Sequence, residues 1–162
     1  GRLKSRPPCR GRGYRGVLRR TGRIQLLTGE RMAKTVHMMI RVLDEARAVN
    51  FYGKCFGLNV AARHEWPDFT LIYMSNSEAT FELELTVNQG RTEPYQLGNG
   101  YGHLAFVVDD LMAEHARIAS LGFAPKDIKE MSFDGKPFGR FFFIEDPDGY
   151  KIEVLQKGGR FV

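Results

Sequence analysis

Two histidines and two glutamates occupy matching places in the sequence and could together hold a divalent metal ion. His37 and His103 each begin an apolar run of strand length, and Glu84 and Glu153 each lie among apolar residues in a later run. The separations are similar, 47 residues from His37 to Glu84 and 50 from His103 to Glu153. Imidazole nitrogens and carboxylate oxygens suit several divalent ions. A lone histidine in a strand is more often structural, but the repetition of the pair favours a metal site.

An internal duplication must position these pairs, because residues 35–85 and 101–155 follow the same order of elements. Each copy reads as a strand, a helix and three further strands. This order predicts an α+β fold of two βαβββ repeats that form curved mixed sheets. Repeat one is expected at about residues 34–87 and repeat two at about 101–156, with residues 88–100 as the linker.

The first copy opens with an apolar run at residues 36–42, which predicts a strand. Asp44 is a predicted N-cap for a helix over residues 45–56, which Gly57 ends. The strands that follow are predicted at residues 58–63, 70–74 and 80–87.

The second copy opens with a predicted strand at residues 103–108, and Asp109-Asp110 precede a helix over residues 111–121. Gly122 ends that helix as Gly57 ends the first. The Pro and Asp-Gly residues at 145–149 predict a tight turn between antiparallel strands. The strands of this copy are predicted at residues 124–128, 140–144 and 150–156.

Strand alternation supports the glutamates as ligands. Glu82 and Glu84 share one face of their strand, so one carboxylate could bind metal while the other meets solvent. Glu153 is isolated among apolar neighbours, where a buried carboxylate needs a partner that a cation can supply. His64 and His115 have no such pairing and are predicted to be surface residues.

Charge is distributed unevenly along the chain. Residues 1–31 contain ten Lys or Arg and one acid, a net charge of +9, which leaves −4 for residues 32–162. The basic segment is rich in Arg, Gly and Pro and is predicted to be a disordered tail. It could be a nucleic-acid-binding arm, an organelle transit peptide, or residues that are no part of the native protein. A natural start at Met32, just ahead of the first ordered pattern, favours the last. Residues 32–162 are expected to form the domain, which is acidic and so does not favour nucleic acid.

Cys9 and Cys55 are the two cysteines, so the sequence suggests neither a disulfide framework nor a cysteine zinc site. No apolar run approaches the roughly 18 residues of a membrane span. These features predict a cytoplasmic protein that does not associate with membranes.

As a set, the motifs resemble the glyoxalase I branch of the vicinal oxygen chelate superfamily, over roughly residues 34–156. The matching segments are Val36-His37-Met38-Met39-Ile40-Arg41-Val42, Asn50-Phe51-Tyr52, Phe56-Gly57-Leu58, Glu84-Leu85-Thr86-Val87-Asn88-Gln89-Gly90, Tyr101-Gly102-His103 and Asp146-Pro147-Asp148-Gly149-Tyr150-Lys151-Ile152-Glu153.

The resemblance implies a homodimer with two sites at the subunit interface. His37 and Glu84 would come from one chain and His103 and Glu153 from the other. Nickel or cobalt is favoured over zinc, one ion per site.

The implied activity is that of a lactoylglutathione lyase, which isomerises the hemithioacetal of methylglyoxal and glutathione to S-lactoylglutathione and so detoxifies methylglyoxal. Glu153 is the implied catalytic base, and Glu84 could share this work for the other stereoisomer. Both histidines would act as ligands.

Four residues are predicted to bind the anionic glutathione. The resemblance implies Arg41 and Asn88, and Lys136 and Arg140 could contact a carboxylate. Two departures from the family pattern weaken the assignment of substrate: Gln89 replaces a common tryptophan, and the loop at residues 136–140 is unusual.

Two alternatives remain open. The first is another metalloenzyme on the same frame: a dioxygenase, a thiol transferase or an epimerase. Dioxygenases of this frame use two histidines and one glutamate, whereas Glu84 offers a fourth ligand here. The second is a metal-free protein that binds a small molecule, for which four ligands would be unnecessary.

Overall fold

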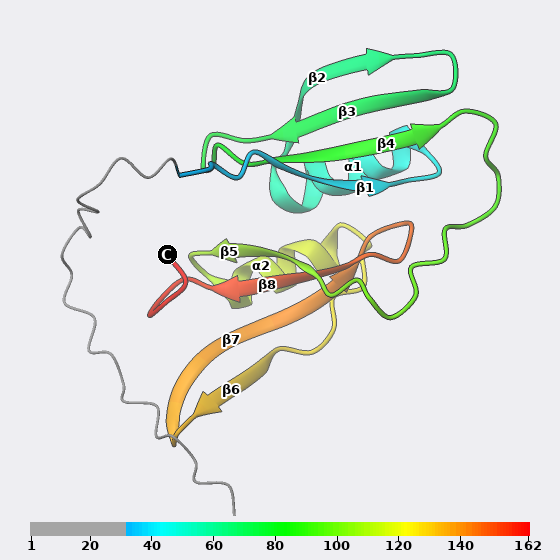
Figure 1. The fold of residues 1–162 in the computed structure, drawn as a ribbon. Coiled ribbons are helices and arrows are strands. Elements are labelled where there is room, and N and C mark those ends of the chain that lie inside the picture. Colours follow the sequence, from blue (N-terminus) through cyan, green and yellow to red (C-terminus); the bar gives the residue numbers. More distant parts are fainter. Residues whose placement is uncertain (1–31) are drawn as a thin grey trace, which may run out of the picture. The chain divides into compact units, whose positions relative to one another are not determined.

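Residues 32–162 are described by a computed structural model, in which each half of the domain has a four-stranded sheet and one helix (Figure 1). The predicted tail at residues 1–31 lies outside the described residues. The order of elements confirms the predicted βαβββ duplication. Within residues 32–162, no helix has the length and apolar character needed to cross a membrane.

The first sheet has the strand order β1-β4-β3-β2. Strand β1 pairs with β4 in parallel, and the other neighbours are antiparallel. The elements of this half are β1 (His37–Arg41), α1 (Glu45–Phe56), β2 (Asn59–Glu65), β3 (Phe69–Ser75) and β4 (Glu82–Asn88).

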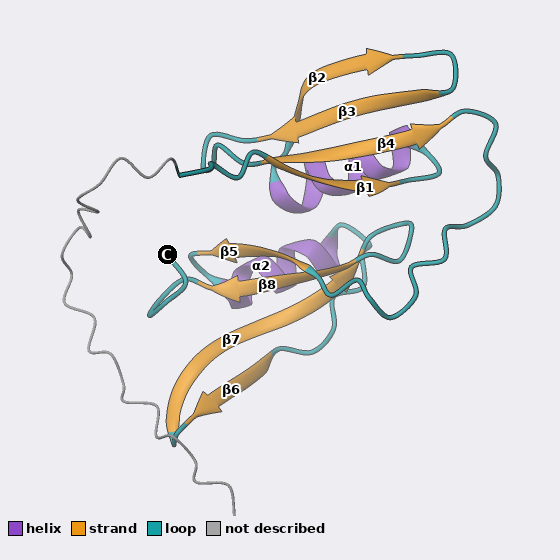
Figure 2. Ribbon diagram, in the orientation of Figure 1, coloured by secondary structure: helices purple, strands orange, loops and turns teal. Residues whose placement is uncertain are grey.

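The second sheet repeats this arrangement with the order β5-β8-β7-β6, and β5 is parallel to β8 (Figure 2). Its elements are β5 (Leu104–Val108), α2 (Leu111–Ser120), β6 (Lys129–Phe133), β7 (Lys136–Glu145) and β8 (Lys151–Gln156).

The helix ends follow the predicted caps. Asp44 accepts a hydrogen bond from the backbone N–H of Arg47 at 2.7 Å, and Asp110 accepts one from Ala113 at 2.9 Å. Gly57 ends α1 in the left-handed conformation, with φ of 63°, which glycine adopts at little energetic cost. The helix that connects the parallel strands in each half therefore begins at the aspartate that the sequence predicts.

The strand predicted at residues 124–128 was wrong, because this segment has no strand structure and β6 begins at Lys129. Asp134 and Gly135 both have positive φ, 51° and 69°, which suits the two-residue turn of a β-hairpin. This turn pairs the residues on either side of it, and so places β6 directly before it. Pro125, which has no N–H to donate, also disfavours a strand at 124–128.

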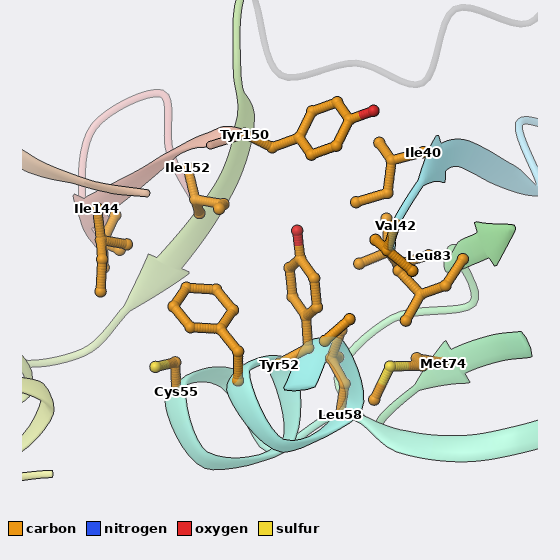
Figure 3. Packing of buried hydrophobic residues seen from close by; sticks show 14 of the residues in the cluster. Ile40, Val42, Tyr52, Cys55, Leu58, Met74, Leu83, Ile144, Tyr150 and Ile152 are labelled. Carbon is orange, nitrogen blue, oxygen red and sulfur yellow. The ribbon is translucent and has the colours of Figure 1, made fainter. Parts of the chain in front are cut away.

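A continuous apolar core contains residues of both halves (Figure 3). Tyr52 of α1 lies in it, 1% exposed, with Val42 of the first half and Ile152 of the second also in the cluster. Its hydroxyl donates a hydrogen bond of 2.9 Å to the buried Asp146 carboxylate. Burial, followed by the charge of Asp146, raises the pKa of Tyr52 well above its usual value.

Asp146 belongs to the predicted turn between β7 and β8, which the structure confirms. Its other oxygen accepts hydrogen bonds of 2.9 Å from the backbone N–H groups of Asp148 and Tyr150. Asp148 in turn accepts one from the N–H of Leu43 at 3.1 Å. The turn of one half thus binds the chain just after β1 of the other.

Replacement of Tyr52 by Phe should lower the free energy of unfolding by about 1–3 kcal/mol, because Asp146 loses a donor in a buried place. Unfolded tyrosine ionises near pH 10. Since the pKa of Tyr52 is higher in the folded state, the stability of the wild type should fall as pH rises above about 10. The stability of the Tyr52→Phe variant should fall less steeply over the same range. Denaturant unfolding at several pH values measures both effects. Tyr95→Phe, in the connection between the halves, is the control, and an equal loss in both variants would contradict the assignment.

Candidate metal centre

The first His–Glu pair lies across two parallel strands. Glu84 of β4 is opposite Met39 of β1, two residues from His37, so all three side chains share one face of the sheet. The Nε2 atom of His37 lies 3.2 Å from a carboxylate oxygen of Glu84. The histidine side chain is 41% exposed and the glutamate side chain 10% exposed. The carboxylate is therefore mostly covered, while the imidazole is partly open to solvent.

The second pair repeats this geometry. Glu153 of β8 is opposite Ala105 of β5, two residues from His103, which lies just before β5 and not in it as predicted. The Nε2 atom of His103 lies 3.1 Å from an oxygen of Glu153, and the side chains are 42% and 15% exposed. The two pairs thus match in the distance between their atoms and in exposure, and each glutamate lies in the strand parallel to the first strand of its half.

The two pairs do not meet within one chain. In residues 32–162, no group of three or more His, Cys, Asp or Glu side chains is placed to hold a metal ion. Each pair offers one imidazole nitrogen and one carboxylate oxygen, a donor set that fits half of a four-ligand site. One chain therefore presents two candidate half-sites, His37 with Glu84 and His103 with Glu153.

Polar groups surround the first pair. Tyr73 of β3 is opposite Glu84 and contacts His37 edge-on, with ring centroids 5.8 Å apart. The pKa of Tyr73 is raised, chiefly by the interaction of its hydroxyl with Glu84. Thr86 is two residues further along β4, with its hydroxyl 3.5 Å from Glu84. Glu84 therefore has two hydroxyl neighbours besides His37.

Apolar groups surround the second pair. Phe143 of β7 is opposite Glu153 and contacts His103 edge-on, with centroids 5.5 Å apart. Phe141 packs against Phe143, and Leu155 follows Glu153 on the same face of β8. These neighbours provide no hydrogen-bond donor to the carboxylate.

Two predicted substrate-binding residues lie on the same face as Glu84. Arg41 is exposed and opposite Thr86, and Asn88 is four residues after Glu84 on β4. The amide of Asn88 donates a hydrogen bond of 2.9 Å to the hydroxyl of Tyr95. The structure thus brings Arg41 and Asn88 to the sheet face of the first half-site.

The other two predicted substrate-binding residues are placed differently. Lys136 is exposed at the start of β7. Arg140 is opposite Glu130 and forms an ion pair of 2.9 Å with it. Because Phe143 shares the face of Glu153, alternation puts Arg140 on the opposite face of β7.

The two remaining histidines differ from each other. His64 is exposed, as predicted, and lies near the rings of Trp66 and Tyr73. His115 is half-buried, so its prediction as a surface residue was only partly right: a ring nitrogen is 3.1 Å from the carbonyl of Lys126. Sequence reasoning also missed Tyr73, although comparison of equivalent positions in the two repeats, Tyr73 and Phe143, could have revealed it.

A cavity of about 800 Å³ lies apart from both pairs. The end of α1, strand β5 and residues 76–83 contribute to its lining, but none of the four candidate ligands does. It includes Cys55, whose pKa burial raises to about 11, so this thiol is a poor nucleophile at neutral pH. The cavity is therefore not the candidate site.

Comparison with known proteins agrees with the fold and the motifs. Residues 34–154 match the Glyoxalase/Bleomycin resistance protein/Dioxygenase superfamily. A lactoylglutathione lyase of Neisseria meningitidis is 36% identical over 128 residues, which are 76% of this chain and 91% of that protein.

Two solved structures of glyoxalase I are also similar. That of Leishmania major, a trypanothione-dependent enzyme, has 31% identity and a TM-score of 0.61, over 77% of this chain and 87% of its own. That of Zea mays has 28% identity and a TM-score of 0.67, and this chain spans less than half, 45%, of the maize chain. This chain therefore belongs to the Glyoxalase/Bleomycin resistance protein/Dioxygenase superfamily.

Proposed function

We propose that this protein is a lactoylglutathione lyase of the glyoxalase I type, which converts the hemithioacetal of methylglyoxal and glutathione to S-lactoylglutathione. The observation that carries the proposal is the pair of matched half-sites, His37 with Glu84 and His103 with Glu153, at 3.2 and 3.1 Å. Relatives with the name lactoylglutathione lyase match over more than nine-tenths of their own length, and so support the same activity for this chain. The cell would use it to remove methylglyoxal.

The proposed metal ligands are His37, Glu84, His103 and Glu153, with nickel or cobalt favoured and zinc as the alternative. The bound cation would stabilise the negative charge that develops on the two vicinal oxygens of the substrate. The two imidazoles must be unprotonated to bind it, and their half-exposed rings leave room for ligands from outside the chain.

Glu153 is the proposed base. Its carboxylate takes the proton from C1 of the hemithioacetal and returns it to C2, while the hydroxyl proton moves from the oxygen on C1 to the oxygen on C2. Phe143 lies opposite Glu153 and Leu155 shares its face of the sheet, so the carboxylate has apolar neighbours. Glu84 remains the second proposed base.

We propose a homodimer in which each site combines the first half-site of one chain with the second half-site of its partner. Each chain would supply one His–Glu pair to each of the two sites, and β1 and β5 are edge strands of their sheets. Met39 on β1 and Val107 on β5 are large apolar residues, 37% and 42% exposed, which association would cover.

Glutathione would lie along the first half-site, where Arg41 and Asn88 share the face of Glu84. An exposed guanidinium and an amide suit its carboxylates and peptide groups. Lys136 and Arg140 remain predictions, since Arg140 is engaged by Glu130 in this structure. A cytoplasmic location and a domain that begins near residue 32 are also part of the proposal.

Metal loading tests the reaction. Metal-stripped protein should be inactive, and one equivalent of nickel or cobalt per chain should restore thioester formation from methylglyoxal and glutathione, followed by ultraviolet absorbance. Zinc should restore less. If all three ions bind stoichiometrically but none gives activity, the proposed reaction is wrong, while the proposed metal site still stands.

Mixed dimers test the shared site. One variant combines His37→Ala with Glu84→Gln, and the other combines His103→Ala with Glu153→Gln; each alone should be inactive. Random reassociation of equal amounts should restore about a quarter of wild-type activity, because about half of the dimers are mixed and each has one intact site. If the mixture stays as inactive as its parts, the ligands are not shared between chains.

The role of Glu153 can be tested separately from folding. Glu153→Gln should lower turnover by about 10²- to 10⁴-fold and retain part of the metal binding, because the proton acceptor is lost but three ligands remain. The matched control is Glu145→Gln, an exposed glutamate at the end of β7 in the same sheet, which should keep its activity. Wild-type turnover in Glu153→Gln would refute the role.

A further inference from the structure

The chain that leaves β4 folds back onto Asn88, one of the residues proposed to bind glutathione. The side-chain amide of Asn88 donates a hydrogen bond of 2.9 Å to the hydroxyl of Tyr95, seven residues further on. Tyr95 is half-buried, although its neighbours Pro94 and Gln96 are exposed. The tyrosine side chain therefore turns inward from the connection between the halves and ends on the amide.

The ring of Tyr95 is itself held in place by Arg91. The guanidinium carbon of Arg91 lies over this ring, 4.2 Å from its centroid, in a cation–π contact. The same guanidinium donates a hydrogen bond of 3.1 Å to the carbonyl of Pro94, the residue before Tyr95. Arg91, Tyr95 and Asn88 therefore form one series of contacts that closes the loop at residues 88–95.

The sheet fixes the backbone on either side of the Asn88 amide. Asn88 is opposite Phe69 of β3, and the N–H of Gln89 donates a hydrogen bond of 2.9 Å to the carbonyl of Asp68. Asn88 also shares its sheet face with Thr86, which is opposite Arg41 on β1. Because the backbone is fixed, the orientation of the side chain decides which groups Asn88 offers to a molecule beside Arg41.

We propose that Tyr95 is a positioning residue for the thiol co-substrate: its hydroxyl holds the Asn88 amide in the orientation that binds glutathione beside Arg41. The role of Tyr95 rests on the proposed function for the identity of this co-substrate. Arg91 supports Tyr95 by fixing its ring.

The physical basis is the conformational entropy of the asparagine side chain. A side chain that rotates freely before binding loses that freedom when a ligand binds to it. The hydrogen bond to Tyr95 makes this loss in the unbound protein, so the ligand binds more tightly. It uses one of the two N–H groups of the amide, and the other N–H and the carbonyl oxygen remain for the ligand. Loss of the Tyr95 hydroxyl should therefore change KM and not kcat, because substrate and transition state are affected alike.

Kinetics with the hemithioacetal of methylglyoxal and glutathione test the restraint in nickel-loaded protein. Tyr95→Phe should raise KM about fivefold, the effect of ordering one side chain, and leave kcat within about twofold of wild type. Asn88→Ala should raise KM further. The control is Thr92→Val, which removes a hydroxyl group from an exposed residue of the same loop and should change neither constant. An unchanged KM in Tyr95→Phe would overturn the proposal.

A double variant separates the positioning of Asn88 from a general effect on the loop. In the Asn88→Ala background, Tyr95→Phe should not raise KM further, because the side chain that Tyr95 positions is gone. If Tyr95 only maintained the structure of the loop, its loss would raise KM by the same factor in both backgrounds. Equal factors in the two backgrounds would therefore overturn the proposal.

Binding of S-methylglutathione, which has no free thiol and cannot react, separates the role of Tyr95 from the proposed function. Calorimetry should show about fivefold weaker binding to Tyr95→Phe than to wild type, and equal binding to Asn88→Ala with and without Tyr95→Phe. If the wild type shows this pattern but forms no thioester, the proposed reaction is wrong and the role of Tyr95 stands.

Two other outcomes count against the role of Tyr95. If the wild type is active and Tyr95→Phe binds S-methylglutathione as tightly as the wild type does, the function stands and the role of Tyr95 is wrong. If the wild type neither forms the thioester nor binds S-methylglutathione, both the function and the role of Tyr95 are wrong.

Discussion

The parallel pairing of the first and last strand in each half is the constraint on which the candidate site depends. Residues far apart in sequence, such as His37 and Glu84, come within 3.2 Å because β1 lies alongside β4 in a fixed register. A shift of one residue in either strand would turn the carboxylate to the core. Parallel neighbours also need a crossover, and the capped helices α1 and α2 begin these crossovers at Asp44 and Asp110.

The halves are joined by a buried polar contact within an apolar core. Tyr52 donates to Asp146, and Asp146 organises the turn that also holds the chain after β1 through Asp148. A buried carboxylate is stable only when its hydrogen bonds are made, and burial still raises the pKa of Asp146. The arrangement is therefore specific as well as stable: it fixes which part of the second half meets the first.

The two halves share a His–Glu pair but differ in the residues around it. Both halves have a histidine at or just before the first strand and a glutamate in the last, but polar groups lie near Glu84 and apolar groups near Glu153. Such differences matter because the environment of a carboxylate, and not its residue type alone, sets its chemical properties. Superfamilies of this kind host many reactions on one fold, so the roles must be argued from the site.

The sequence by itself determined the duplication, the helix caps and the four candidate ligands, because local patterns such as alternation, Asp caps and glycine ends specify these features. Only the tertiary structure decided that β6 begins at Lys129, that Arg140 pairs with Glu130, and that Tyr73 lies opposite Glu84. It also showed that the two ligand pairs remain apart within one chain. These features depend on strand register and on contacts between distant segments, which no local pattern encodes.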